Sequence, residues 1–143
     1  MEYNKGAHTV YYTRYHVVFV TKYRRKVLKH GMGEYAIRLL RAVCRIHPEL
    51  VIHEAKCDED HIHFLITIPP AMSIAHAVNL LKTNSSSAMR KRFPLIKNMY
   101  YTDDVMFWSP GYFVSTVGAD EEVIKKYIQH QGQEDSGQAK LVL

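Results

Sequence analysis

The alternating run HIHFLITI at residues 61–68 constrains the fold of this chain more than any other stretch. Successive side chains of a β-strand point to opposite faces, so the run places all its bulky apolar side chains but one on a single face. That face consists of Ile62, Phe64, Ile66 and Ile68. It has to be covered by another layer of the protein, whereas the opposite face begins with His61 and His63. The run therefore predicts a sheet that is packed on one side and carries two imidazoles on the other.

The rest of the chain predicts three further strands and three helices. β-Branched and aromatic residues favour the strands, and the acidic turn before His61 indicates a hairpin. The expected strands are 15–21, 51–59, 61–69 and a final strand region over 105–118. Helical spacing of apolar residues and the caps Ser73 and Asp120 favour the helices. The expected helices are 33–47, 74–94 and a last one from 120 to about 131.

The order of these elements indicates a fold class. Strand, helix, strand, strand, helix and strand form the split βαβ pattern of the ferredoxin-like (RRM-like) α+β fold, in which two helices cover one face of an antiparallel sheet. The apolar face of the strand 61–69 belongs under those helices, so the extra C-terminal helix is the candidate to meet the histidine face. We expect one domain over residues 1–132 and a polar, flexible tail over 133–143.

The composition indicates a globular protein with a basic surface. The chain has 143 residues with 19 Lys and Arg against 14 Asp and Glu, and this excess favours a polyanionic partner. No apolar stretch approaches the ~20 residues of a membrane span, and the N-terminus lacks the apolar block of a secretory signal, so we expect no membrane association and a cytoplasmic location. Cys44 and Cys57 lack the spacing of a zinc site or a disulfide framework and are expected to be reduced packing residues.

Two residues of the last helix carry possible chemistry. Tyr127 and Gln131 are one turn apart, so a hydroxyl nucleophile and a carboxamide share a helix face. A tyrosine among Val and Ile is more commonly a core aromatic, and histidines at i and i+2 of a strand are often half-buried polar residues. The spacing alone leaves a catalytic and a structural interpretation open.

Other titratable residues have a simpler interpretation. Five histidines have no comparable pairing in the sequence and are expected to be structural or surface residues. They are His16, His47, His53, His76 and His130. Five acidic residues in turn-like stretches are expected to be solvated. They are Asp58, Glu59, Asp60, Asp103 and Asp104.

Five segments together resemble a known family. DHIHFLITIP resembles the His-hydrophobic-His motif of the HUH endonucleases, and KKYIQHQ adds a single downstream tyrosine with a glutamine four residues later. YHVVFVTKYRRKVL, LLKTNSSSAMRKRFP and WSPGYFVSTVG resemble, in the same order, segments of the small single-tyrosine transposases of the insertion-sequence 200/605 superfamily. The resemblance covers nearly the whole chain.

The resemblance implies an activity and a site. His61, His63 and Gln131 would bind a divalent metal, and Tyr127 would be the nucleophile that cleaves DNA and forms a 5′-phosphotyrosine. Imidazole and amide ligands alone would permit zinc, whereas the family implies Mg²⁺ or Mn²⁺. The implied substrate is single-stranded DNA with hairpins at transposon ends, and the implied assembly is a homodimer with active sites shared between subunits.

Basic and aromatic residues are the candidates for contacting this DNA, because Lys and Arg follow the phosphate backbone while bases stack on aromatic rings. The candidates are Tyr23, Arg24, Arg25, Arg90 and Arg92. Two alternatives remain: a non-catalytic RRM-like nucleic-acid-binding module, and an HUH replication initiator or relaxase-type nickase. The RNP-type aromatic motif of an RRM is absent from the sequence, and the short chain with one catalytic tyrosine favours the transposase.

Overall fold

The computed structural model describes residues 3–94, 107–116 and 121–136, and its centre is a four-stranded antiparallel sheet. The strands are β3 (Arg14–Val20), β4 (Val51–Cys57), β5 (His61–Thr67) and β6 (Phe113–Ser115). Their order across the sheet is β4-β5-β3-β6, so β5 lies in the interior and pairs with both β3 and β4. This is the ferredoxin-like arrangement, and the predicted fold class is confirmed.

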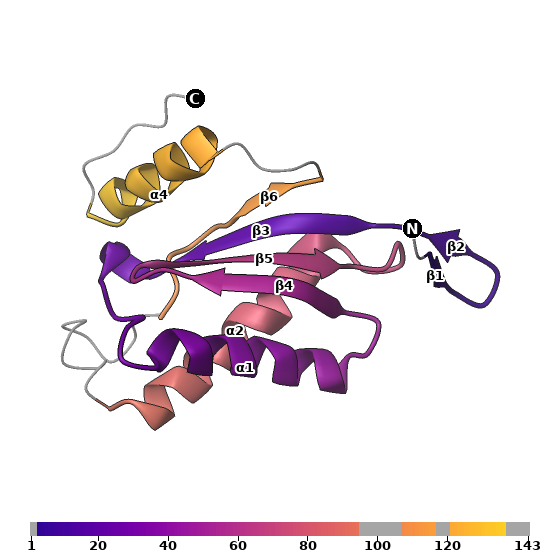
Figure 1. Ribbon diagram of the computed structural model, residues 1–143, viewed down its shortest axis with the longest axis horizontal. Helices are drawn as coiled ribbons and strands as arrows, with labels where there is room; N and C mark the ends of the chain where they lie inside the picture. The colour runs from indigo at the N-terminus through magenta and orange to yellow at the C-terminus, as the bar shows by residue number, and fades with distance from the viewer. Residues whose placement is uncertain (1–2, 95–106, 117–120, 137–143) are drawn as a thin grey trace.

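Two helices cover one face of the sheet (Figure 1). They are α1 (Met32–Ile46) and α2 (Ile74–Arg92). The Ser73 side chain caps α2 by accepting a hydrogen bond from the backbone N–H of His76 at 3.0 Å, as its position in the sequence predicts. Beneath the helices, Ile62, Phe64 and Ile66 of β5 are at most 1% exposed, so the apolar face of the alternating run forms the core.

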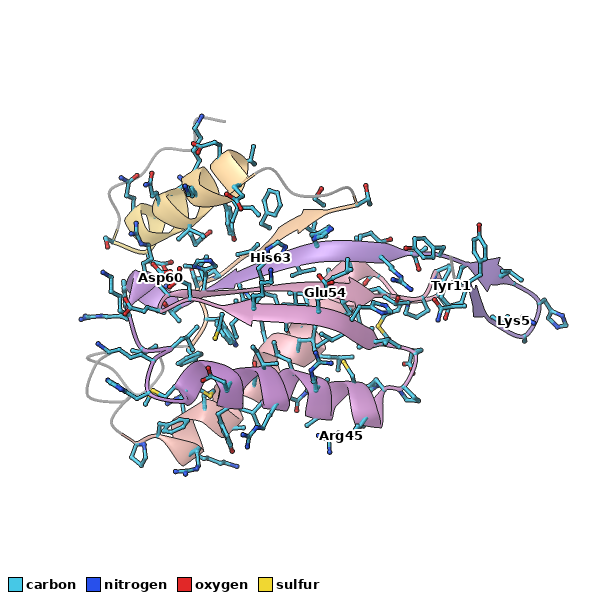
Figure 2. All side chains as sticks on the ribbon, viewed as in Figure 1. Lys5, Tyr11, Arg45, Glu54, Asp60 and His63 are labelled. Carbon is cyan, nitrogen blue, oxygen red and sulfur yellow. The ribbon has the colours of Figure 1, made fainter. Side chains whose placement is uncertain are left out.

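The third helix, α4 (Glu121–Asp135), lies on the other face of the sheet (Figure 1). Its Ile124 and Ile128 pack against Val18 and Val20 of β3 in a small second hydrophobic cluster. Figure 2 shows His63 and Asp60 on this side of the sheet, and Arg45 in the opposite helical layer. The histidine face therefore meets the C-terminal helix, as the alternation of the strand predicts.

Several boundaries differ from the prediction. Within 105–118, only Phe113–Ser115 forms a strand among the described residues, and Trp108 makes a single bridge to Thr21. Helix α4 continues to Asp135, so residues 133–135, expected to belong to a flexible tail, are helical, and the side chain of Asp135 is 2% exposed. The expected cap Asp120 and the tail from residue 137 lie outside the described residues.

Three short elements were not expected from the sequence. An N-terminal hairpin pairs β1 (Asn4–Lys5) with β2 (Val10–Tyr11) and projects from one end of the sheet (Figure 1). A 3-10 turn, η1 (Lys22–Arg24), follows β3, and its Tyr23 has a left-handed backbone with φ of 59°. Over the described part of the chain, no helix combines the length and the apolar character needed to cross a membrane.

Candidate functional site

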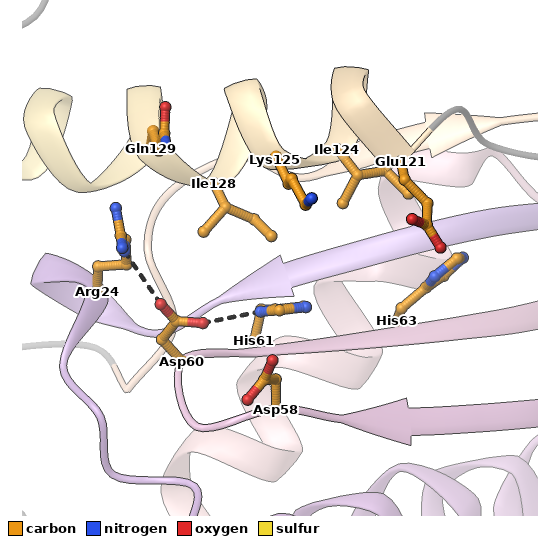
Figure 3. Close-up of a pocket in the computed structure, with 10 residues that line it drawn as sticks. All are labelled: Arg24, Asp58, Asp60, His61, His63, Glu121, Ile124, Lys125, Ile128 and Gln129. Carbon is orange, nitrogen blue, oxygen red and sulfur yellow. Dashed lines mark hydrogen bonds and ion pairs between the residues drawn. The ribbon is translucent and has the colours of Figure 1, made fainter.

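His61 and His63 line a cavity between β5 and α4 (Figure 3). Both side chains are half-buried, and the cavity has a volume of about 400 Å³. Its sheet side also includes Asp58 and Asp60. Its helix side is formed by Glu121, Ile124, Lys125, Ile128 and Gln129. The predicted imidazole pair therefore faces an open, mixed polar and apolar space that a ligand could enter.

Asp60 holds the ring of His61 in place. Its carboxylate Oδ1 lies 2.8 Å from Nδ1 of His61, and its Oδ2 accepts a hydrogen bond from Nε of Arg24 at 3.0 Å. Burial opposes ionisation of Asp60, but His61 and Arg24 together keep its pKa below the usual value. Asp60 was expected to be a solvated turn residue, and that prediction is wrong because its side chain is only 13% exposed and bridges His61 and Arg24.

A third imidazole adjoins His63. Nδ1 of His16 on β3 lies 3.2 Å from Nε2 of His63, and the two ring centroids are 5.4 Å apart. Burial lowers the pKa of His63, and the nearby His16, His61 and Lys56 lower it further against the opposite effect of Glu54, which favours the neutral imidazole. His16 was expected to be a structural or surface residue, and the structure places it beside His63 on the same face of the sheet.

Tyr127 and Gln131 lie on the other flank of α4. The Tyr127 ring packs against Phe113 of β6 with ring centroids 5.9 Å apart. A Cβ placed on Gly111 would lie 3.7 Å from both the Tyr127 hydroxyl and Oε1 of Gln131. Because Ile124 and Ile128 face the sheet, the helix separates these two side chains from the residues that line the histidine cavity. One chain in this conformation thus does not bring the four predicted site residues together.

The environment of Tyr127 disfavours its phenolate. Burial raises the pKa of Tyr127 well above the ordinary value of 10.0, and the negative charge of Asp135 raises it further. Attack on a phosphate would need a different environment from the one seen here.

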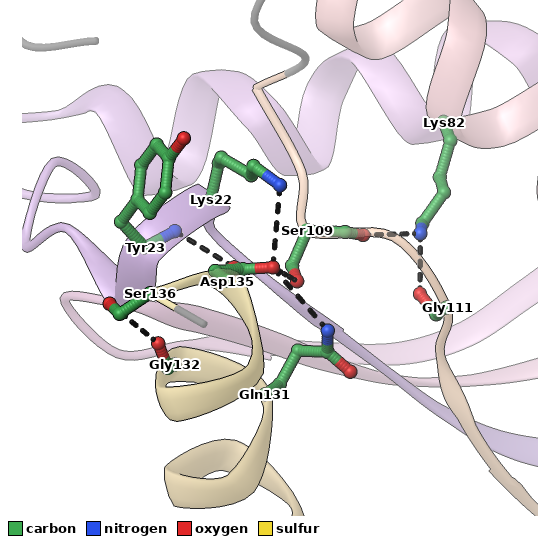
Figure 4. A network of polar contacts seen from close by, with 9 residues as sticks. All are labelled: Lys22, Tyr23, Lys82, Ser109, Gly111, Gln131, Gly132, Asp135 and Ser136. Atoms are coloured by element: carbon green, nitrogen blue, oxygen red, sulfur yellow. Dashed lines mark hydrogen bonds and ion pairs between the residues drawn. The ribbon is translucent and has the colours of Figure 1, made fainter. Parts of the chain in front are cut away.

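Asp135 anchors the end of α4 (Figure 4). Its side chain is 2% exposed and accepts from the backbone N–H of Tyr23 at 2.9 Å and from Ser109 Oγ at 2.9 Å. The Lys22 ammonium lies 3.4 Å away, and Nε2 of Gln131 lies 3.5 Å away. The amide of Gln131 is thereby oriented with Nε2 toward Asp135, which leaves Oε1 as a possible ligand atom.

A buried lysine holds the segment beside Tyr127. Lys82 of α2 donates to the carbonyl oxygen of Ser109 at 2.7 Å and to that of Gly111 (Figure 4). Burial lowers the pKa of Lys82 to about 8, although the charge of Asp135 acts in the opposite direction. Sequence reasoning missed Lys82, because a lysine in a helix is ordinarily exposed.

The five candidates for DNA contact do not gather at one place. Arg24 is engaged by Asp60, and Tyr23 is 36% exposed beside α4. Arg90 and Arg92 belong to α2, in the layer on the opposite face of the sheet from the histidines, and the Arg92 guanidinium lies 5.1 Å from the centroid of the Phe93 ring. DNA contact by these residues and by Arg25 stays a prediction.

The histidine pair by itself would make only part of the predicted metal site. Within the described ranges, no three His, Cys, Asp or Glu side chains converge as a group that could hold a metal ion. The chemistry of the two imidazoles nevertheless fits a ligand role, since Asp60 contacts only Nδ1 of His61 and His16 contacts only Nε2 of His63, so each ring keeps a second nitrogen for a ligand. A further ligand has to come from elsewhere, and the Gln131 amide is the predicted one.

The sequence of this chain is similar to that of known transposases. A family model described as IS200-like transposase matches residues 9–131. The transposase for insertion sequence element IS200 of Salmonella typhimurium is 40% identical over 130 residues, which cover 90% of this chain and 83% of that protein. The ISDra2 transposase TnpA of Deinococcus radiodurans is 29% identical over 133 residues, or 92% of each chain.

Two solved structures are also similar. A crystal structure described as a transposase from Deinococcus radiodurans R1 has a TM-score of 0.79 and 29% identity, covering 90% of this chain and 97% of that one. The structure of a REP-associated tyrosine transposase bound to a REP hairpin has a TM-score of 0.51 and 12% identity, covering 94% of this chain and 76% of that one. At that identity the second likeness concerns the fold alone.

Proposed function

This chain belongs to the IS200-like transposase family, and we propose that it cleaves and rejoins single-stranded DNA through a covalent bond to Tyr127. The family implies DNA strand cleavage and transfer. The observation that carries the finer proposal is the pair His61 and His63 facing an open cavity beneath the helix that bears Tyr127 and Gln131. An RRM-like binding module would instead present aromatic side chains on its inner strands, where this chain has His61 and His63.

The chemical step follows from the properties of a phenol. The Tyr127 hydroxyl attacks the scissile phosphorus and loses its proton, the bond from phosphorus to the 3′ oxygen breaks, and that oxygen leaves as a 3′-hydroxyl after taking a proton. The product is a 5′-phosphotyrosine. A phosphodiester is exchanged for a phosphodiester, so the reverse attack by a 3′-hydroxyl rejoins strands without a nucleotide cofactor.

The predicted metal, Mg²⁺ or Mn²⁺, would be held by His61, His63 and Gln131 and would supply neutralisation of the charge on the phosphate oxygens. Asp60 fixes the ring of His61, and Asp135 fixes the amide of Gln131. These contacts support the ligand assignment because side chains that bind metals are ordinarily oriented by a second hydrogen bond.

The assembly we propose is a homodimer in which α4 of one subunit meets the histidine cavity of the other. The separation of Tyr127 and Gln131 from that cavity within one chain supports this proposal. The substrate we propose is single-stranded DNA that folds into hairpins at the ends of the element. The net charge of +5 suits a polyanion, and a protein of the same fold has been solved with a REP hairpin.

The test is a covalent-adduct assay with labelled single strands taken from the ends of the element, incubated with Mg²⁺ or Mn²⁺. A protein-linked 5′ end on a denaturing gel is the expected result, and Tyr127→Phe should remove it while hairpin binding persists. His61→Ala and His63→Ala should also remove it. An adduct formed by Tyr127→Phe would overturn the nucleophile assignment, and hairpin binding without any adduct would favour the binding-module alternative.

A further inference from the structure

We propose that Asp60 positions His61 as a metal ligand and that Arg24 couples this positioning to the helix that carries the tyrosine. The proposal rests on the metal site of the proposed function. It assigns to Arg24 a role different from the DNA contact that the sequence suggests. Three contacts support it: Asp60 with His61, Asp60 with Arg24, and Arg24 with α4.

The contact between Asp60 and His61 selects a tautomer. An ionised carboxylate only accepts hydrogen bonds, so the 2.8 Å separation from Oδ1 places the proton of His61 on Nδ1. The lone pair then resides on Nε2, the atom free to bind a metal. Figure 3 shows the carboxylate on one side of the ring and the open cavity on the other. The same contact prevents the ring from flipping.

Asp60 is itself held rigidly. Its backbone carbonyl accepts from the backbone N–H of Thr21 at 3.0 Å, and Thr21 is fully buried. The Thr21 hydroxyl donates to the Arg25 carbonyl at 2.7 Å and lies 3.1 Å from the Asp60 carbonyl. The second carboxylate oxygen accepts from Nε of Arg24 at 3.0 Å (Figure 3). With both oxygens and the backbone engaged, the carboxylate has little freedom to turn away from His61.

Arg24 joins this pair to α4. A Cβ placed on Gly132 would lie 3.1 Å from both Cβ and Cδ of Arg24, so the helix backbone rests directly on the aliphatic part of the arginine. The same face of η1 is fixed by Asp135 through the Tyr23 backbone. Movement of α4 would remove the helix from the aliphatic carbons of Arg24, whose side chain is 40% exposed, and would leave the guanidinium freer to turn away from Asp60. The position of the tyrosine helix and the orientation of His61 are therefore linked through two side chains.

The test measures the affinity of the full chain for Mn²⁺. Mn²⁺ is titrated into the protein, and binding is detected by calorimetry and by the electron paramagnetic resonance signal of the Mn²⁺ that stays free. Asp60→Ala should weaken binding about 10- to 100-fold, the range found when a partner of a ligating histidine is removed. Arg24→Ala should weaken it less, and the double variant should be no weaker than Asp60→Ala because both act through one carboxylate. Lys26→Ala, which removes an exposed charge from the same segment, should leave binding unchanged.

Each contrary result identifies what fails. If His61→Ala does not reduce Mn²⁺ binding, the metal site of the proposed function is wrong. If His61→Ala reduces it but neither Asp60→Ala nor the shape-preserving Asp60→Asn does, the positioning role is wrong. If Arg24→Ala lowers hairpin affinity without metal and leaves Mn²⁺ affinity unchanged, Arg24 is a DNA contact and the coupling is overturned. Thermal unfolding of each variant identifies any that misfold, and Asp60→Asn then decides in place of Asp60→Ala.

Discussion

The carboxylate of Asp135 accepts the backbone N–H of Tyr23 at 2.9 Å, joining the last turn of the tyrosine helix to the turn that follows the first strand of the central sheet. Asp135 also accepts from Ser109 and pairs with Lys22. We predict that Asp135→Ala weakens the docking of α4 by about 2 to 4 kcal/mol, because charged hydrogen bonds are lost and the hydroxyl of the buried Ser109 is left without its acceptor. Hydrogen exchange of the α4 amides measures the change.

Asp135→Asn is the matched control for that prediction. Its side-chain oxygen still accepts the Tyr23 N–H, but the ion pair with Lys22 is gone, so exchange should lie between the wild type and Asp135→Ala. Equal exchange rates in all three proteins would show that the carboxylate does not anchor the helix.

Gly132 permits the close approach of α4 to η1. Alanine is favoured over glycine in a helix by about 1 kcal/mol, so Gly132→Ala should strengthen the helix if nothing opposed it. The new Cβ would lie 3.1 Å from Cβ and Cδ of Arg24, however, so either the arginine or the helix has to give way by a few tenths of an ångström. We predict faster exchange of the α4 amides in Gly132→Ala. Gln133→Ala, an exposed change one residue later, should slow exchange or leave it unaltered. Slower exchange in Gly132→Ala would contradict the contact.

Local patterns in the sequence were sufficient to predict most of the fold. The alternation in β5 identified the buried face, and Ser73 marked the start of α2. The end of α4 was misplaced because glycine and polar residues after Gln131 are typical of a tail. The helix continues because the Asp135 carboxylate pairs with Lys22 and accepts a hydrogen bond from Ser109, and both residues are far from it in the sequence. No local pattern reveals such contacts.

Only the parts of the candidate site that lie on one strand or one helix were predictable from the sequence. The face shared by His61 and His63 follows from one strand, but the partners Asp60 and His16 depend on a turn conformation and on the pairing of β3 with β5. A signal for His16 was present in the sequence. His16 lies at every-second-residue spacing from Val18 and Val20, so the three side chains share one face of β3. Pairing β3 with β5 so that the opposite faces of both strands lie under the helices would have placed His16 on the histidine face.

Gly33 lies where α1 crosses the edge strand β4. A Cβ added there would lie 2.5 Å from Sγ of Cys57 and 3.2 Å from its Cβ. We predict that Gly33→Ala lowers the free energy of unfolding by about 1 to 3 kcal/mol, the usual cost of overpacking a core. Adding Cys57→Ala removes the sulfur and should recover most of the loss, as measured by urea denaturation. No recovery in the double variant would show that the backbone, and not the thiol, resists the added methyl group.

Lys82 gives the stability of the protein a dependence on pH. Burial lowers its pKa from the ordinary value of 10.5 to about 8 in the folded protein. Between these values the unfolded chain binds more protons than the folded one, so stability rises with pH and is lost as pH falls through about 8. From pH ~7.5 to ~9.5 we predict a gain of about 2 kcal/mol in wild type that is absent in Lys82→Met. Lys126→Met, at an exposed lysine of α4, should retain the gain, and urea denaturation at both pH values measures it. An equal pH dependence in wild type and Lys82→Met would show that Lys82 keeps an ordinary pKa in spite of its burial.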